Sequence, residues 1–137
     1  MKINYLLALA FSFSCYGNTN ISIGENNILV DAQKIEINKK DKEIYFKDGL
    51  NIENEYIFIN GNSAIFNNTN KILNISGNKA KIRSNSLENP FSGSANSILI
   101  YSDNSIELNG DAIFQNDGIT FKSSSIKFNQ QNGRIIQ

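Results

Sequence analysis

The side chains in this sequence that could act as general acids or bases are carboxylates, because the chain contains no histidine. Histidine is the commonest general base and the commonest transition-metal ligand, so its absence argues against zinc chemistry and against a Ser-His-Asp triad. Two carboxylates on one inner face could still hydrolyse a glycoside. Most acidic residues instead fall in outward-facing or turn positions of alternating segments: Asp31, Glu36, Glu43, Glu53, Glu55, Glu107 and Asp111. We therefore expect no catalytic residue, no metal site and no cofactor.

Two Gly-Asn segments and one run of cations could bind phosphate groups. Gly61-Asn62-Ser63 and Gly77-Asn78-Lys79 have the small residues of a phosphate loop, but no helix is predicted after either to offer its N-terminus. We interpret both as turns. In Lys79-Ala80-Lys81-Ile82-Arg83, alternation puts three cations on one outer strand face, with Ala80 and Ile82 pointing inward. This face is either a solvated edge that discourages aggregation or a contact for phosphates at the rim of a lipid slot.

The elements that must position these side chains are short β-strands arranged in a repeat. Each copy of the repeat begins with a small residue, which is followed by an alternating apolar and polar run, a polar turn, a second alternating run and a glycine. The copies begin near Ala32, Gly61, Gly93 and Ser123, and three of them close at Gly49, Gly77 and Gly110. A repeat built from period-two segments predicts stacked hairpins that share one apolar interior, without a helix.

Strands this short are not stable alone, so the hairpins should stack their apolar faces into two layers. The inward side chains are aliphatic residues and phenylalanine, with small alanines at Ala64, Ala80 and Ala112. Such a lining either meets across the middle as a dry core or stays apart and leaves an apolar slot. Periodicity favours the filled core but does not exclude the slot.

The composition and the first residues indicate a single exported domain. The chain has 137 residues with 13 basic and 13 acidic side chains, so its field would not concentrate nucleic acid on the surface. Residues 1–17 combine a positive start, an apolar stretch and small residues, which predicts a signal peptide cut after Gly17. The remaining domain, residues 18–137, has no cysteine, which favours the bacterial periplasm. Two alternatives stay open: residues 5–13 could remain as a membrane tether, and Cys15 could accept a lipid.

Three segments of the sequence are similar to one known family. They are Ile28-Leu29-Val30-Asp31-Ala32-Gln33-Lys34-Ile35-Glu36-Ile37, then Ile57-Phe58-Ile59-Asn60-Gly61-Asn62-Ser63-Ala64-Ile65-Phe66, and finally Asn89-Pro90-Phe91-Ser92-Gly93-Ser94-Ala95 followed by Ile106-Glu107-Leu108-Asn109-Gly110-Asp111-Ala112. In their order and spacing they resemble the lipopolysaccharide-transport periplasmic proteins with an OstA-like β-jellyroll, of which LptA is the type. The chain departs from the pattern at Gly61-Asn62, where the family usually has Ala-Asp. It also lacks the longer tail of many relatives, which leaves the pairing of the C-terminal edge open.

The resemblance implies an all-β fold, a twisted and incompletely closed β-jellyroll of stacked antiparallel hairpin repeats over residues 18–137. It also implies a periplasmic carrier that shields lipid A acyl chains in an apolar groove between the inner and outer membranes. The implied lipid-facing residues are Ile28, Ile35, Ile37, Phe46, Ile82, Ile98, Ile100, Leu108 and Phe114. Unpaired strands near Ile28 and Ile135 would add to LptC-like and LptD-like jellyrolls, or to further copies of the chain head to tail.

Two other functions remain open from the sequence. A structural or adhesive β-repeat would have a filled core and would display only its outer face. A membrane-tethered, LptC-like relative would keep residues 5–13 as an anchor in place of a cleaved signal peptide. The N-terminal residue of the exported protein separates the tethered relative from a free carrier, since a free carrier would begin at Asn18.

Overall fold

The computed structural model describes residues 12–14 and 18–137. The regular structure in these residues consists of ten β-strands and contains no helix. The strands are β1 (Ser12–Ser14), β2 (Asn18–Ile23), β3 (Asn26–Asn38), β4 (Glu43–Glu53), β5 (Ile57–Gly61), β6 (Ser63–Asn67), β7 (Ile72–Ser84), β8 (Phe91–Ile100), β9 (Ser105–Asn116) and β10 (Ile119–Asn129). Apart from β1, the expected signal peptide lies outside the described residues. Within the described part, no helix is long and apolar enough to cross a bilayer.

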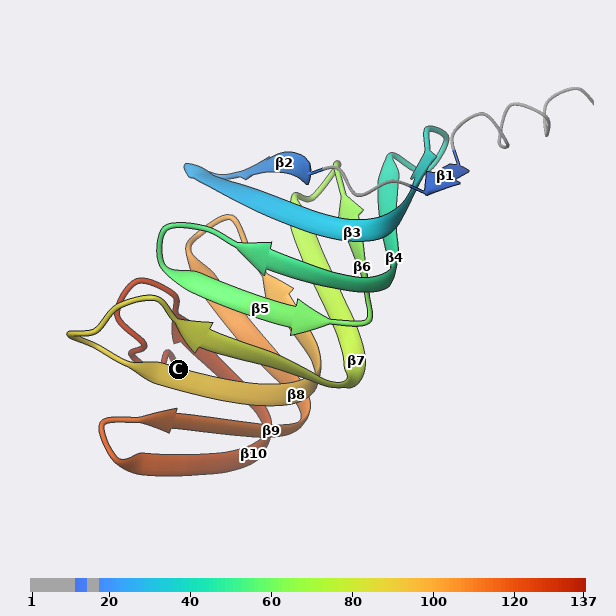
Figure 1. Cartoon of the computed structure of the whole chain (residues 1–137). Helices are drawn as coiled ribbons and strands as arrows, with labels where there is room; N and C mark the ends of the chain where they lie inside the picture. Colours follow the sequence, from blue (N-terminus) through green and yellow to red (C-terminus); the bar gives the residue numbers. More distant parts are fainter. Residues whose placement is uncertain (1–11, 15–17) are drawn as a thin grey trace, which may run out of the picture.

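All strand pairs are antiparallel and join into one sheet (Figure 1). The order is β1-β3-β4-β5-β7-β8-β9-β10, with β2 paired to β3 and β6 paired to β4 and β7. In the described residues, β10 does not pair with β1 or β2, so the sheet does not close into a barrel. The all-β, incompletely closed architecture expected from the repeat is thus confirmed.

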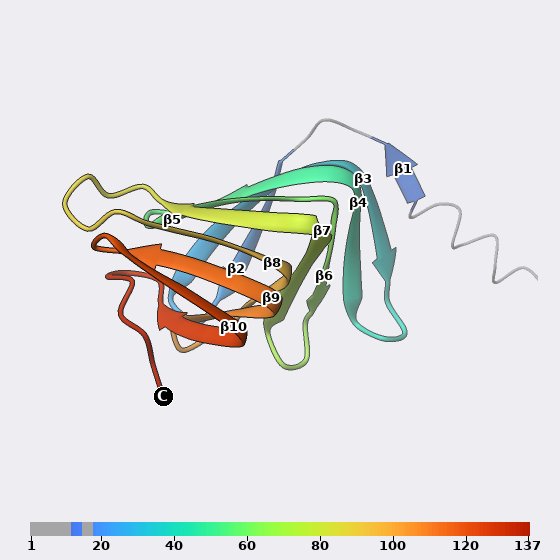
Figure 2. The same cartoon turned by 90° about the horizontal axis from the view of Figure 1, so that it is seen from below.

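The long strands bend in the middle, and this crease folds the sheet into two layers (Figure 2). The pairing register shifts at the crease, for instance between Ala32 and Lys34 and between Ser76 and Ala80. We call residues 18–32, 50–61, 80–95 and 112–123 the first layer. Residues 34–47, 63–76, 97–109 and 125–129 form the second layer. Each long strand therefore contributes one half to each layer.

The glycines that close the copies of the repeat, Gly49, Gly77 and Gly110, lie at this crease and do not end hairpins. Gly49 and Gly110 have φ angles of 92° and 88°, and their neighbours Asp48 and Asp111 also have positive φ. Two successive left-handed residues redirect a strand without reversing it, and glycine adopts that conformation without a steric penalty. Gly77-Asn78-Lys79 was expected to be a turn, but it lies inside β7. That expectation was wrong because a bend within a paired strand uses the same residue types as a turn between strands.

The hydrophobic core lies between the two layers. The inward positions of each strand form one continuous cluster of aliphatic and phenylalanine side chains. At its C-terminal end, the Phe114 ring stacks on Phe128 with centroids 4.3 Å apart, and Phe91 meets Phe128 edge-on at 5.3 Å. Alternation along strands of both layers therefore produces one shared interior, as the repeat predicts.

Candidate functional site

The interior between the layers contains eight of the nine side chains that the family resemblance assigns to lipid. These eight are Ile28, Ile35, Phe46, Ile82, Ile98, Ile100, Leu108 and Phe114, and all are at most 7% exposed. Ile37 differs, because it lies near the tip of the β3–β4 hairpin and is 39% exposed. The structure thus brings the predicted residues together from both layers, and Ile37 lies at the outer end of this lining. Their role in lipid binding stays a prediction.

The two layers are in contact across the middle of the interior. Ile28, Phe46, Ile98, Leu108 and Phe114 have no surface that a water molecule could reach. A lining that stood apart would leave water-accessible surface on these side chains. Of the two alternatives left open by the sequence, this structure therefore has the packed interior, and any guest between the layers requires them to separate.

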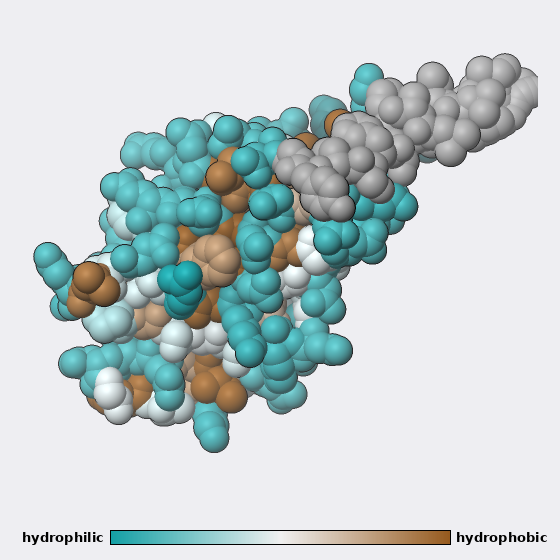
Figure 3. Space-filling model, viewed as in Figure 1, coloured by the Kyte–Doolittle hydropathy of each residue, from teal (hydrophilic) through white to brown (hydrophobic). Residues whose placement is uncertain are grey.

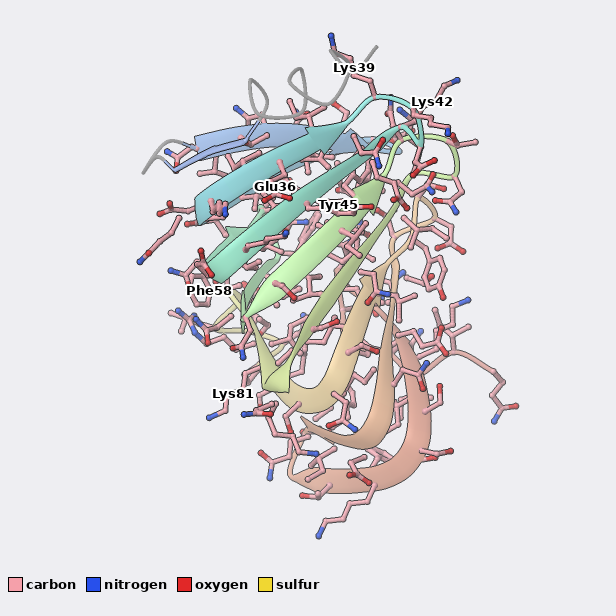
Figure 4. All side chains as sticks on the ribbon, turned by 90° about the vertical axis from the view of Figure 1, so that its right-hand side faces the viewer. Glu36, Lys39, Lys42, Tyr45, Phe58 and Lys81 are labelled. Carbon is pink, nitrogen blue, oxygen red and sulfur yellow. The ribbon has the colours of Figure 1, made fainter. Side chains whose placement is uncertain are left out.

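The interior opens to solvent at the tips of β3, β4 and β6. Ile37, Ile44 and Phe66 line a cavity of about 330 Å³ there, and the rim carries Lys39 and Lys42. Figure 4 shows both lysines on the β3–β4 hairpin. We call this cavity the mouth. It combines an apolar floor with a rim that carries two lysines and the carboxylate of Glu43. The apolar floor suits an acyl chain, and the lysines suit an anionic group attached to it.

Away from the mouth, polar side chains connect the tips of the two layers. Asn54, between β4 and β5, donates a hydrogen bond of 2.7 Å from Nδ2 to Oε1 of Gln130, just after β10. Asn116 Nδ2 donates to the carbonyl of Gly133 at 2.9 Å, and Asn26 Nδ2 donates to Asn104 Oδ1. We call these contacts the amide seam.

Gln130 is the buried centre of the amide seam. It is 0% exposed, and its backbone N–H donates to the carbonyl of Asn104 at 3.0 Å. Its side-chain Nε2 has no hydrogen-bond partner. A buried amide with one unsatisfied group costs free energy, so this part of the seam is less stable than a fully paired contact. Neither periodicity nor composition marks Gln130, because it follows the last alternating segment.

The edges of the sheet differ from those expected. Ile28 pairs with Ile21 of β2, and Ile135 forms a bridge with Phe128, so neither residue lies on an unpaired strand. The expectation was wrong because segments beyond the recognised repeat, β2 and the C-terminal tail, fold back onto the outermost strands. Within the described residues, the outer side of β2 and residues 119–123 of β10 are edges without a strand partner. There Ile119 is 56% exposed and Phe121 is 37% exposed.

Several carboxylates on the outer face are held by a lysine or a tyrosine. Glu36 Oε1 accepts a 2.9 Å hydrogen bond from Lys47 Nζ, and this bond lowers the pKa of Glu36. Tyr45 donates to Glu43 at 2.7 Å, which raises the pKa of its phenol. In the described residues, no three His, Cys, Asp or Glu side chains gather as a metal site would need.

The fold of the chain is similar to that of a known protein, and its sequence matches a family model. Among solved structures, the chain is similar to LptH from Pseudomonas aeruginosa, the LptA homologous periplasmic component of the conserved lipopolysaccharide transport device. The TM-score is 0.71 at 17% sequence identity, and the match covers 85% of each chain. No curated protein matches the sequence. The family model described as LptA/(LptD N-terminal domain) LPS transport protein matches residues 15–134. The chain therefore belongs to the LptA/LptD N-terminal domain family of lipopolysaccharide transport proteins.

Proposed function

We propose that the protein carries lipopolysaccharide through the periplasm, with the acyl chains of lipid A between the two layers and the sugars in water. The observation that carries the proposal is the continuous apolar interior, to which both layers contribute. Each buried methylene is worth roughly 0.8 kcal/mol, so one chain of about twelve carbons gains on the order of 10 kcal/mol before ordering costs. Like its family, the chain is a non-enzymatic transport protein.

Loading of the interior starts at the mouth. The mouth is already open, while the deeper side chains such as Ile98 and Leu108 are packed. An acyl chain that enters over Ile37 and Phe66 replaces contacts between the layers with contacts to itself. The net cost of separating the layers is then small, because the apolar side chains stay out of water throughout.

The free edges give the carrier a way to form a bridge. An exposed strand edge pairs with another strand through backbone hydrogen bonds. The outer side of β2 would pair with an LptC-like jellyroll, residues 119–123 of β10 with an LptD-like one, and successive copies head to tail. Cleavage after Gly17 would also remove β1, which pairs with residues 34–36, and would lengthen the N-terminal edge.

Photo-crosslinking in cells tests where the lipid lies. A photoreactive residue at Ile100, which is 0% exposed, is expected to capture lipopolysaccharide. The matched control is the neighbouring Leu99, whose side chain points to the opposite face of β8. Equal capture at both positions, or capture at neither, would contradict an interior site.

The packed interior also supports a second candidate, a structural β-repeat that carries no lipid. Native mass spectrometry of the protein from the periplasm separates the two, since only the carrier should retain lipopolysaccharide. The same spectrum gives the N-terminal residue. Asn18 as the first residue would identify a free carrier, and retention of residues 5–13 a membrane-tethered relative.

A further inference from the structure

The outer face of the first layer contains a groove that the interior site does not use. Its volume is about 610 Å³, and it runs across β5, β7, β8 and β9 on the side opposite the packed core. Figure 3 shows this side of the molecule, with apolar and weakly polar residues gathered between hydrophilic ones. The outward-facing side chains that line it are those of Phe58, Asn60, Lys81, Arg83, Ser92, Ser94, Ile113 and Gln115.

The strand register explains why the face is hollow here. One row of cross-strand neighbours runs Phe58, Arg83, Ser92, Gln115, and the next runs Asn60, Lys81, Ser94, Ile113. Both rows place a serine on β8 between longer side chains on β7 and β9. The short serines form the floor of the groove, and the longer side chains form its sides.

The groove is positively charged, although the chain as a whole is neutral. None of its lining residues is acidic, and the ion pairs formed by the described lysines and arginines involve Lys34, Lys47 and Lys79 but neither Lys81 nor Arg83. The Arg83 guanidinium lies 4.6 Å from the centre of the Phe58 ring, and this contact keeps the guanidinium at one side of the groove. Figure 4 shows Phe58 and Lys81 on the same side of the molecule.

These groups have the chemistry of a phosphosugar site. Lys81 and Arg83 are two residues apart on one strand, about 6.7 Å, so one phosphate between them can contact both cations. The hydroxyls of Ser92 and Ser94 can donate to the same phosphate, because each is the register partner of one of the cations. Asn60 Nδ2 donates to Asn51 and Gln115 Nε2 donates to Thr120, so it is the amide oxygens of Asn60 and Gln115 that can accept from sugar hydroxyls. Phe58 and Ile113 offer apolar surface for the carbon face of a ring.

We propose that this groove binds a phosphorylated sugar. Two sources share that chemistry, the phosphorylated sugars of a lipopolysaccharide and a free sugar phosphate, and the first rests on the proposed function. Because the groove and the interior lie on opposite faces of the first layer, the groove holds the sugars of a second molecule and not those of the lipid whose chains lie inside. The groove is thus a second site, independent of whether the layers separate.

Calorimetric titration of the purified protein tests the proposal with probes that lack acyl chains. Glucosamine 6-phosphate and deacylated lipopolysaccharide are the two ligands, and glucosamine and inorganic phosphate are the controls. We expect both phosphosugars to bind more tightly than either control. If deacylated lipopolysaccharide binds at least about tenfold more tightly than glucosamine 6-phosphate, the lipid headgroup is the ligand. If the two affinities are equal, the ligand is a free sugar phosphate. Binding of inorganic phosphate as tight as that of both phosphosugars would overturn the sugar site.

Substitutions locate the binding. Lys81→Gln with Arg83→Gln should weaken phosphosugar affinity at least about tenfold, because both charge-assisted contacts are lost. The matched control is Lys127→Gln, since Lys127 also lies over an aromatic ring, 4.8 Å from the centre of Tyr101, but on the second layer. Unchanged binding in the double variant, or an equal loss in Lys127→Gln, would overturn the site.

Chemical-shift mapping of the unsubstituted protein gives a readout that needs no variant. Glucosamine 6-phosphate should shift the backbone amides of residues 81–83 and 92–94. Shifts confined to the mouth, around Ile37 and Phe66, would overturn the proposal. Because the probe carries no acyl chain, a groove that does not bind it leaves the proposal of an interior lipid site unaffected. Conversely, photo-crosslinking at Ile100 can fail while the groove still binds its probe, so the two proposals are tested separately.

Discussion

At the scale of single residues, one group of polar contacts that stabilises the fold lies on the outer face of the second layer. The Tyr101 hydroxyl donates to Glu107 Oε1 at 2.6 Å, and Ser125 Oγ donates to Glu107 Oε2 at 2.9 Å. Burial, followed by the hydrogen bond to Glu107, raises the pKa of Tyr101 to about 12. The hydrogen bonds from Tyr101 and Ser125 lower the pKa of Glu107. These three residues connect β8, β9 and β10 across the face opposite the core.

The Tyr101–Glu107 contact should make stability depend on pH at both extremes. The folded pKa of Tyr101 lies above its ordinary value of 10.0, so its contribution is complete below that value and is lost as the pH rises through about 12. The folded pKa of Glu107 lies below its ordinary value of 4.5, so its contribution is present above that value and is lost in acid. We expect Tyr101→Phe to lower the free energy of unfolding by about 1 kcal/mol at neutral pH.

Urea unfolding at several pH values measures this effect. The difference between the unsubstituted protein and Tyr101→Phe should be constant from neutral pH to about 10 and shrink between pH 10 and 12. A difference that stays constant up to pH 12 would mean that the phenol does not stabilise the fold through this hydrogen bond.

At the scale of elements, the crease and the amide seam determine how the layers can move. The crease is continuous, because β3, β4, β7, β8, β9 and β10 each run through both layers. The seam consists of a few polar contacts between loops, including Gln130 with its unpartnered Nε2. Separating the layers at their tips therefore breaks side-chain contacts and leaves the strand pairing intact. Any separation of the layers would therefore turn about the crease.

A covalent link across the seam should prevent lipid from entering. Gln131, which follows Gln130 and is exposed, donates from Nε2 to the Tyr56 hydroxyl on the opposite tip at 3.4 Å. Tyr56→Cys and Gln131→Cys, joined by a short bis-maleimide in a chain with Cys15→Ser, would hold the tips of the two layers together. We expect the photoreactive residue at Ile100 to capture no lipopolysaccharide once the two cysteines are linked. The same variant without the linker should capture lipopolysaccharide again.

The control for this experiment has the same local chemistry within one layer. Asn60 Nδ2 donates to Asn51 Oδ1 at 2.8 Å, and both residues belong to the first layer. Linking Asn51→Cys to Asn60→Cys should leave capture unchanged. If both links abolish capture, or neither does, separation of the tips is not the step that admits lipid.

At the scale of the whole molecule, the two ends of the sheet are unlike each other. The N-terminal end is β2, which covers only the first-layer half of β3. At the C-terminal end, the tail covers the second-layer half of β10 through Ile135, and Ile136 N–H donates to the Lys127 carbonyl at 2.8 Å. Residues 119–123 keep an open edge in the first layer. Each end of the sheet therefore has an open edge in the first layer, which permits continuous pairing from one molecule to the next.

Charges placed beside the open edge of β10 should reduce self-association. Ile119→Lys with Phe121→Lys removes apolar contact area and adds like charges at an end-to-end contact, so we expect the dimer dissociation constant to rise at least about tenfold. Sedimentation velocity over a range of concentrations measures it. Ile65→Lys is the control, because Ile65 is 42% exposed but lies on β6 with strands on both sides. Equal effects from both variants would contradict pairing through this edge.

The sequence by itself determined the fold class, the repeat and the inward face of most strands from β3 onward. Alternation is local, so Ile98, Ile100 and Leu108 could be assigned to an interior without knowledge of their distant neighbours. The resemblance carried by three segments led to the correct family for the same reason, since their order and spacing are properties of the chain alone.

Only the tertiary structure decided how the layers meet and where the sheet ends. Contact across the interior depends on the angle at the crease, which residues such as Gly49 and Gly110 permit but do not specify. Some contacts join positions that are far apart in the chain, and no local period encodes them. Examples are the hydrogen bond between Asn54 and Gln130 and the neighbouring positions of Phe58, Arg83 and Ser92. The covering of Ile28 by β2 and of Phe128 by Ile135 depends likewise on segments that fold back, so the free edges could be placed only in three dimensions.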